Sequence, residues 1–324
     1  MGIKPTTKTK ISSAITRRAE LFDRYDCFRL FDGKGDGIEN LVIDKLDRVA
    51  IVHSFGAISD PISIFSDPDY LRLFKVETIY HRNRPINSGN QEGATLTLLV
   101  GKSNPEFIIN EQGLKLIIRP ERALNGGIFL DTRDLRAKLS QSSNQKKVLN
   151  TFSYTGSLGL ASYLGGAEEV VQVDSSKSTI GWAKENFEIN RSPELGRVSF
   201  IVDDTLTFLK REVIRIENGK KSSYGIVILD PPTFGRSEKG SFKLEAALSD
   251  LIEFGFRILS EKGLLYLCVN NKNYSHPALE QKVCETLGKA NYQIMESLFA
   301  PSIDFTTPCN DTSVFRGLII GKNM

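Results

Sequence analysis

The feature that most constrains the fold is a regular alternation of apolar strands and helical stretches across residues 123–324. The strands are short and rich in β-branched residues, and stretches of about ten to fifteen residues with helical periodicity separate them. Such alternation is typical of βαβ units, whose strands run parallel in one sheet covered by helices. We therefore predict an α/β fold with an open doubly wound sheet that binds ligands at the carboxyl ends of its strands. The expected strands are KVLNTF, EVVQVD, RVSFIVD, GIVILD, GLLYLCV, YQIMESLFA and VFRGLIIG, and the expected helices begin near Ser157, Ser176, Thr205, Leu244 and Pro277.

Residues 1–122 carry a different pattern, in which short strands and turns dominate. Residues 11–25 have apolar side chains at near-helical spacing and predict one helix. Residues 27–55 contain β-rich runs broken by Asp-Gly and Gly-Asp, which is typical of hairpins. Further strands are expected at 95–101, 106–113 and 114–120, with a tight turn between the last two. We predict a small α+β domain over 1–122, a candidate for substrate or RNA recognition, followed by a second domain over 123–324.

Composition narrows the class of protein without naming its substrate. The 324 residues are 40% hydrophobic and 25% charged, and the net charge of +3 permits a nucleic-acid partner without requiring one. The first residues lack the apolar core of a signal peptide and no long apolar run occurs, so we expect a cytoplasmic protein with no membrane partner. Four widely spaced cysteines form no CxxC pair, which argues against a zinc site, and we expect no metal: Cys27, Cys268, Cys284 and Cys309.

The segment VLNTFSYTGSLGLAS, residues 148–162, predicts a strand, a turn containing Gly156 and a helix. Such a turn lets backbone amides approach a ligand at the positive end of the helix. Phe152 and Tyr154 occupy places that a pyrophosphate-binding loop would give to glycine. The loop therefore predicts a small cofactor that carries no pyrophosphate.

Acidic residues follow three successive strands of the predicted sheet. Asp174 is placed to accept hydrogen bonds from both hydroxyls of a ribose, although it would also suit the N-cap of the next helix. Of the next two acids we favour Asp204 over Asp203 as the acceptor for an adenine amino group. Asp230 precedes two prolines, which stop the strand and hold a carboxylate at the sheet edge.

Taken together, the motifs NTFSYTG, VDSS, VDDTLTF and LDPPTFGRS resemble those of class I S-adenosylmethionine-dependent methyltransferases, specifically the Rlm group that acts on 23S ribosomal RNA. GGIFLDTRDLRAKL resembles a segment that precedes the first strand in this group, and CFRLFDGKGDGIENLVIDKLD resembles its small N-terminal domain. The resemblance implies a Rossmann-like methyltransferase domain, S-adenosyl-L-methionine as cofactor and large-subunit rRNA as partner. Many relatives in its cytosine branch carry an N-terminal PUA domain, which we expect this chain to lack.

The resemblance also implies roles for individual residues. Those expected at the cofactor are Phe129, Asp131, Arg133, Asn150, Phe152, Ser153, Tyr154, Thr155, Gly156, Asp174, Ser175, Asp203, Asp204 and Asp230. Those expected at the methyl acceptor are Asp230, Pro231, Phe234 and Asn270. For Asp131, Arg133 and Asp134 a surface ion-pair cluster is an alternative interpretation. For Phe234, which related enzymes place against the target base, the alternative is an ordinary core phenylalanine.

The presence or absence of a cysteine distinguishes the two candidate methyl acceptors, cytosine C5 and a guanine nitrogen. Methylation at cytosine C5 needs an attacking thiolate, whereas a guanine ring nitrogen already carries a lone pair. Asn270 stands where the cytosine branch has its cysteine, and Cys268 lies two residues earlier, about 6 to 7 Å along the strand. We interpret Cys268 as a buried strand residue, so the sequence favours guanine nitrogen over cytosine C5. Asn270, Asn271 and Lys272 resemble the guanine-N7 branch.

Several assignments stay open from the sequence. A methyltransferase for a protein or small molecule, or a non-catalytic binding protein with the cofactor fold, would also fit. Basic side chains expected at an RNA phosphate, or merely in solvent, are Arg236, Lys239 and Lys243 in one loop and Lys8, Lys10, Arg17, Arg18 and Arg24 near the start. Asp304 and Phe305 are expected near the site by resemblance.

Overall fold

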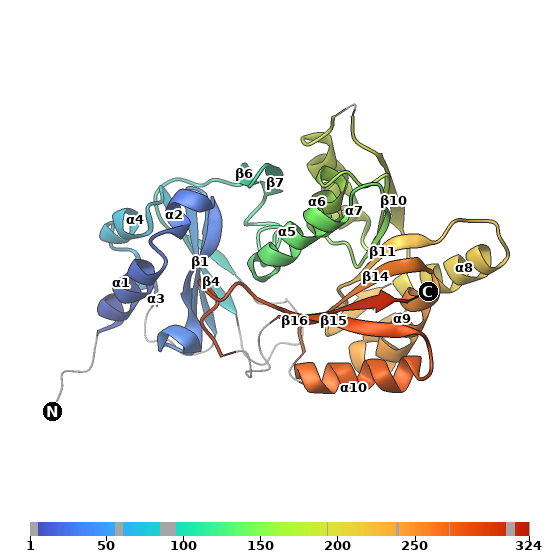
Figure 1. The fold of residues 1–324 in the computed structure, drawn as a ribbon. Coiled ribbons are helices and arrows are strands. Elements are labelled where there is room, and N and C mark those ends of the chain that lie inside the picture. The colour runs from blue at the N-terminus through green and yellow to red at the C-terminus, as the bar shows by residue number, and fades with distance from the viewer. Residues whose placement is uncertain are drawn as a thin grey trace. The chain divides into compact units, whose positions relative to one another are not determined.

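The computed structural model of the chain describes residues 6–55, 61–84, 95–192, 194–237, 240–271, 273–308 and 315–323. Its contacts divide into two compact units (Figure 1). The first comprises Met1–Leu130 and Pro301–Pro308, and the second comprises Asp131–Ala300 and Cys309–Met324. No described helix is both long and apolar enough to cross a membrane.

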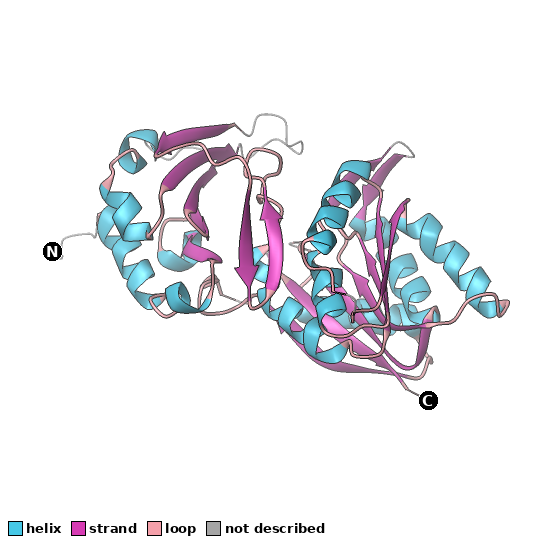
Figure 2. Ribbon diagram, turned by 90° about the horizontal axis from the view of Figure 1, so that it is seen from above, coloured by secondary structure: helices cyan, strands magenta, loops and turns pink. Residues whose placement is uncertain are grey.

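The first unit is a five-stranded mixed sheet with helices on one face (Figures 1 and 2). Its strands, in spatial order, are β1 (Cys27–Asp32), β2 (Leu41–Leu46), β3 (Val49–Phe55), β4 (Thr78–Arg84) and β5 (Leu96–Val100). Its helical segments are α1 (Thr7–Arg17), α2 (Leu21–Arg24), η1 (Gly33–Asp36), α3 (Pro61–Phe65) and α4 (Asp69–Phe74).

The helices of the first unit contribute to its hydrophobic core. The Thr6 hydroxyl caps α1 by accepting from the Thr9 amide, and Ile11 and Ala14 on one face of this helix are fully buried. They pack with Phe28 of β1 and other apolar side chains of the sheet. A separate hairpin joins β6 (Phe107–Glu111) to β7 (Leu114–Ile118). Its turn is left-handed at both central residues, which confirms the tight turn expected there.

The second unit is a seven-stranded sheet in the order β10-β9-β8-β11-β14-β16-β15. The first five strands run parallel, and β16 and β15 are antiparallel to their neighbours. Helices cover both faces of this sheet (Figure 2), so the predicted doubly wound fold is confirmed. The strands are β8 (Lys147–Thr151), β9 (Glu169–Asp174), β10 (Arg197–Val202), β11 (Tyr224–Leu229), β14 (Leu259–Val269), β15 (Tyr292–Phe299) and β16 (Arg316–Lys322).

The helices of this unit start close to the expected residues, because polar caps mark their ends. Ser176 caps α7, Asp204 caps α8 and Ser275 caps α10, each accepting from a backbone amide of the first turn. The helical segments are η2 (Leu130–Thr132), α5 (Arg133–Ser142), α6 (Ser157–Leu164), α7 (Lys177–Glu188), α8 (Thr205–Glu217), α9 (Leu244–Arg257) and α10 (His276–Leu287).

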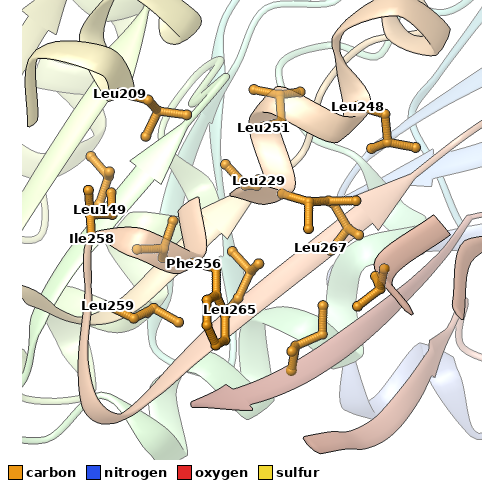
Figure 3. Packing of buried hydrophobic residues seen from close by; sticks show 14 of the residues in the cluster. Leu149, Leu209, Leu229, Leu248, Leu251, Phe256, Ile258, Leu259, Leu265 and Leu267 are labelled. Carbon is orange, nitrogen blue, oxygen red and sulfur yellow. The ribbon is translucent and has the colours of Figure 1, made fainter. Parts of the chain in front are cut away.

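One hydrophobic cluster of the second unit lies between the sheet and the helices α8, α9 and α10. Leu229 and Leu267, from the adjacent strands β11 and β14, are fully buried against Leu248 and Leu251 of α9 (Figure 3). Burying a leucine side chain is worth about 1.5–3 kcal/mol. This packing holds the central strands, and with them the sheet edge where the predicted ligand residues lie.

Some features differ from the sequence-based expectation. The change between units falls at Leu130 rather than at residue 122, and residues 301–308 join the first unit although they follow β15 of the second. The second unit also contains the helix α5 and a short hairpin of β12 (Phe234–Ser237) with β13 (Gly240–Lys243). Neither element gave a clear periodic signal.

Candidate functional site

The order of the sheet places the candidate site between β8 and β11. These neighbouring strands are the point where the chain turns from one side of the sheet to the other. Their last residues, Thr151 and Leu229, pair in register, and the Thr151 hydroxyl donates to the Ile228 carbonyl at 2.9 Å. In open α/β sheets the crevice beyond such strand ends binds ligands.

The loop after β8 has an unusual backbone. Phe152 and Tyr154 both have φ of 51°, and Gly156 has φ of 83°. A left-handed conformation at a bulky residue costs on the order of 1–3 kcal/mol and persists only where the surroundings enforce it. Alternating left-handed residues turn successive N–H groups toward one concave side, which suits an electron-rich ligand atom.

Neighbouring elements hold this loop in place. The Tyr154 amide donates to Asp174 at 2.9 Å, and Asn186 of α7 donates to the Thr155 carbonyl at 2.9 Å. A side chain at Gly156 would come within 3.0 Å of Ala183 Cβ, so only glycine fits between the loop and α7. The loop is therefore prearranged by contacts with β9 and α7.

Asp174, at the end of β9, is committed to the loop by several hydrogen bonds. One carboxylate oxygen accepts from Tyr154, and the other accepts from the Ser176 amide at 2.8 Å and the Thr179 hydroxyl at 3.2 Å. The N-cap of α7 is Ser176, so the alternative that Asp174 caps this helix is wrong. Ser175, beside it, is exposed at the same edge.

Two buried polar atoms near the loop have no hydrogen-bond partner within the described chain. They are Asn150 Oδ1 and Ser153 Oγ. The Nδ2 of the same Asn150 side chain donates to Gln172 at 2.8 Å. A buried polar group without a partner costs about 1–3 kcal/mol. Both residues belong to the predicted cofactor set, and a bound polar ligand would satisfy such atoms.

Asp203 and Asp204 follow β10 and differ in what they already bind. Asp203 accepts from the Asp204 amide and pairs with Arg211. Asp204 caps α8 through Oδ1, which accepts from the amide and the hydroxyl of Thr207 at 2.9 and 2.8 Å. Its Oδ2 accepts no hydrogen bond within the described chain, which supports the preference for Asp204 as an adenine acceptor.

Asp230 and Asp131 bring two carboxylates together at this edge. Burial, aided by the negative charge of Asp131, raises the pKa of Asp230 to about 7. Arg133, two residues after Asp131, is buried and forms an ion pair with Asp134 at 3.9 Å. The ion pair agrees with the alternative of an ion-pair cluster, and the buried position of Arg133 agrees with a residue of a site. A cation placed beside the two carboxylates would stabilise their ionised forms.

Residues expected at the acceptor lie at the same edge with different exposures. Phe234 is 69% exposed, so a core position is wrong for it, and Pro231, next to Asp230, is buried. Asn270 is exposed just beyond β14, and its carbonyl accepts from the Thr233 hydroxyl at 2.6 Å. Cys268 is fully buried, and burial, aided by the charges of Asp230 and Asp131, raises its pKa well above the usual thiol value.

Other expected residues belong to the first unit or lie outside the described residues. Asp304 lies in the first unit, where it accepts from the Arg29 amide at 3.1 Å, and the Phe305 ring stacks under the Arg29 guanidinium at 4.3 Å. Their expected place near the site remains a prediction. Phe129, 37% exposed, also belongs to the first unit. Lys239, Lys272 and the side chain of Arg236 lie outside the described residues.

Phe242 is a residue that the sequence did not single out. Its ring packs on that of Phe152, with centroids 5.4 Å apart, and so ties the β12–β13 hairpin to the loop after β8. No periodic pattern marked it, because the hairpin is short. Among the described residues, no group of three histidine, cysteine or acidic side chains is arranged to hold a metal ion.

A comparison with protein families decides the class. The family model of S-adenosylmethionine-dependent methyltransferases matches residues 77–302. The chain belongs to this family. The cofactor of the enzyme is thus S-adenosylmethionine. The residues at the sheet edge fit this cofactor, because the two carboxylates suit its sulfonium and ammonium groups. Its polar atoms would also give hydrogen-bond partners to Asn150 Oδ1 and Ser153 Oγ, which have none within the described chain.

Individual relatives of this methyltransferase agree with that assignment. The chain is 27% identical over 308 residues to "Putative ribosomal RNA large subunit methyltransferase YwbD" of Bacillus subtilis (strain 168), covering 92% of this chain and 75% of the relative. It is 28% identical over 248 residues to "Ribosomal RNA large subunit methyltransferase I" of Escherichia coli O139:H28, covering 75% of this chain but 60% of the relative. The fold matches SMU.776, "a putative methyltransferase complexed with SAH", with a TM-score of 0.86 at 24% identity over 99% of this chain and 83% of that one.

Proposed function

We propose that this methyltransferase modifies a base of large-subunit ribosomal RNA, and that the acceptor is a guanine nitrogen rather than cytosine C5. The names of the two relatives support ribosomal RNA as the substrate class. The chain spans 60% of the length of the second relative, so we argue the activity of this chain from its site rather than from the name of that relative.

The observation that carries the choice of atom is the state of Cys268. Attack on cytosine C6 needs a thiolate that reaches the base. Cys268 is fully buried, and burial raises the pKa of its thiol well above the usual value, so it stays protonated inside β14. The exposed position beyond the strand is occupied by Asn270, whose amide can hydrogen-bond a base edge but forms no covalent bond.

The residues of the chain then have a positioning task. Bound S-adenosylmethionine supplies a methyl group activated by its sulfonium, and transfer to a lone pair needs chiefly in-line alignment. Asp131 and Asp230 would hold the cationic end of the cofactor, Asp174 its ribose and Asp204 its adenine. Asn150, Ser153 and the loop amides would complete the pocket.

Phe234 would hold the acceptor base. It is the first residue of β12, four residues after Asp230, and most of its ring is open to solvent. Stacking of a base on such a ring contributes about 1–3 kcal/mol. An exposed aromatic side chain beside a cofactor edge favours a planar unpaired base as the substrate.

The experiment that tests this proposal is mass spectrometry of rRNA nucleosides from a strain lacking the gene. We expect one N-methylated guanosine to disappear and to return with the wild-type gene but not with Asp230→Ala. Unchanged modification of every rRNA nucleotide would refute rRNA as the substrate. Loss of 5-methylcytidine instead would refute the choice of guanine nitrogen.

A methyltransferase acting on a protein or small molecule is the competing proposal. Labelled methyl groups supplied as S-adenosylmethionine to a cell extract would then enter protein or small solutes. We expect the label in RNA, and its appearance in the protein fraction alone would favour the competing proposal.

A further inference from the structure

The first unit contains a cluster of cationic side chains on one face of its sheet. β3 and β4 are parallel neighbours, paired so that His53 faces Arg82 and Phe55 faces Arg84. Directly paired residues point to the same face of a sheet, so these four side chains lie together near the carboxyl ends of the two strands. We call Phe55 and Arg84, with the nearby Arg82 and Arg29, the arginine corner.

Arg29 is already neutralised within the fold. Its guanidinium donates to Asp44 at 2.9 Å and to Asp32 at 3.1 Å, and it stacks on Phe305. The positive charge of Arg29 holds the pKa of Asp44 well below its usual range, despite burial, so this pair is a fixed part of the unit. Arg82 donates to the carbonyls of Ala123 and Pro120.

Arg84 differs from both. It is partly buried at the end of β4, and within the described chain its guanidinium makes neither a hydrogen bond nor an ion pair. Its Cζ lies 5.1 Å from the centroid of the Phe55 ring. A guanidinium has five N–H donors arranged to bind a carboxylate or phosphate, so Arg84 is able to donate to such a group.

Arg84 interacts with charges of both signs: burial lowers its pKa, the negative charge of Asp44 opposes this shift, and the positive charge of Arg29 adds to it. Burial lowers the pKa of His53, and the charges of Arg84 and Arg82 lower it further against the opposing effect of Asp44. His53 Nδ1 is itself buried without a hydrogen-bond partner in the described chain. The arginine corner would therefore bind an anionic ligand.

We propose that the arginine corner binds the RNA backbone, with Arg84 gripping a phosphodiester and Phe55 offering its ring to the adjoining unpaired base. This inference rests on the proposed RNA substrate and assigns the first unit a part in holding it. The pairing of an arginine with an aromatic ring is suited to single-stranded RNA, since the phosphate takes the charge and the base takes the ring.

The basic residues near the start of the chain are poorer candidates. Arg18 is fully buried and donates to Asp36 at 2.7 Å and to the Asp304 carbonyl at 2.8 Å. Arg17 pairs with the same Asp36, and Lys10 donates to the Gly37 carbonyl at 2.8 Å. These groups stabilise the first unit, so their charges are less available to RNA than that of Arg84.

The test compares full-length variants in binding a labelled single-stranded RNA oligonucleotide at several salt concentrations. Arg84→Gln removes the charge, Arg84→Lys keeps it without the planar fork, and Phe55→Leu removes the ring. Arg48→Gln is the matched control. Arg48 is an exposed arginine that directly precedes β3, at the opposite end of the same sheet, and it pairs with Glu77. S-adenosylmethionine binding and thermal melting are measured for each variant.

We expect Arg84→Gln to weaken RNA binding about tenfold and to reduce the salt slope by about 1. Arg84→Lys should lose less affinity, Phe55→Leu should weaken binding about fivefold or more, and Arg48→Gln should match the wild type. Equal RNA binding by wild type and Arg84→Gln would overturn this inference while leaving the RNA substrate intact. The inference would also be overturned if both Arg84 variants bound S-adenosylmethionine less tightly or melted at a lower temperature than the wild type. Arg84 would then stabilise the fold rather than bind RNA. No binding or methylation of RNA by the wild type would instead refute the proposed function and, with it, this inference.

Discussion

Replacing Asp230 with asparagine should make the cofactor-free enzyme more stable while abolishing its activity. The carboxylate of Asp230 lies at the edge of β11, where burial and the charge of Asp131 raise its pKa from 3.8 to about 7. A group whose pKa is higher in the folded state binds protons preferentially there, so its ionisation opposes folding as the pH rises.

The size of the effect follows from these two values. The difference between 3.8 and about 7 corresponds to at most about 4 kcal/mol of unfolding free energy. Below pH 4 the group is protonated in both states and contributes nothing. The penalty grows as the pH rises from about 4 and is complete above about pH 7. Asparagine has a similar shape and no charge, so the variant escapes the penalty.

The assay is urea unfolding of the cofactor-free protein between pH 5 and pH 8. We expect the stability advantage of Asp230→Asn to grow across this range and to reach a few kcal/mol at pH 8. Asp250→Asn is the control, because Asp250 lies on α9 and makes no hydrogen bond or ion pair within the described chain. An advantage that is absent at pH 8, or equal at both ends of the range, would refute the account of the two carboxylates.

The remaining predictions concern the same site. Cys268→Ser should keep at least half of the methyl-transfer rate, because the thiol is protonated and buried; a loss of more than tenfold together with a trapped enzyme–RNA adduct would contradict this. Gly156→Ala should lower stability by about 1–3 kcal/mol, measured by thermal melting, and should weaken S-adenosylmethionine binding, because φ is 83° and the new Cβ meets Ala183 at 3.0 Å. Titration calorimetry should show S-adenosylmethionine binding the wild type more tightly at pH 8 than at pH 5.5, since its cationic groups favour ionised Asp230; a binding constant independent of pH would contradict the pairing.

The sequence predicted much of the second unit because its signals are local. Strands with continuous apolar runs and helices capped by Ser176, Asp204 and Ser275 are marked by neighbouring residues, and the structure confirms them. The strand β4 was missed in the first unit. Its sequence, TIYHRNR, carries one histidine and two arginines where a half-buried strand would alternate with apolar residues, so no period of two appears.

Contacts between distant parts of the chain were beyond local patterns. The hydrogen bond from Arg18 to Asp304 joins residues far apart in sequence and draws 301–308 into the first unit. Likewise, the left-handed backbone at Phe152 and Tyr154 depends on Asp174 and α7, although the missing glycines were visible in the sequence. The proximity of Asp131 to Asp230 was expected from resemblance alone, since no spacing rule links them.

The central claim is methylation of RNA on a guanine nitrogen, and the most direct measurement is transfer of a labelled methyl group to total RNA by the purified enzyme. Digestion to nucleosides and mass spectrometry then identify the labelled product. The account predicts labelled N-methylguanosine, formed by the wild type and by Cys268→Ser but not by Asp230→Ala. Label in 5-methylcytidine, or in no RNA nucleoside at all, would contradict it.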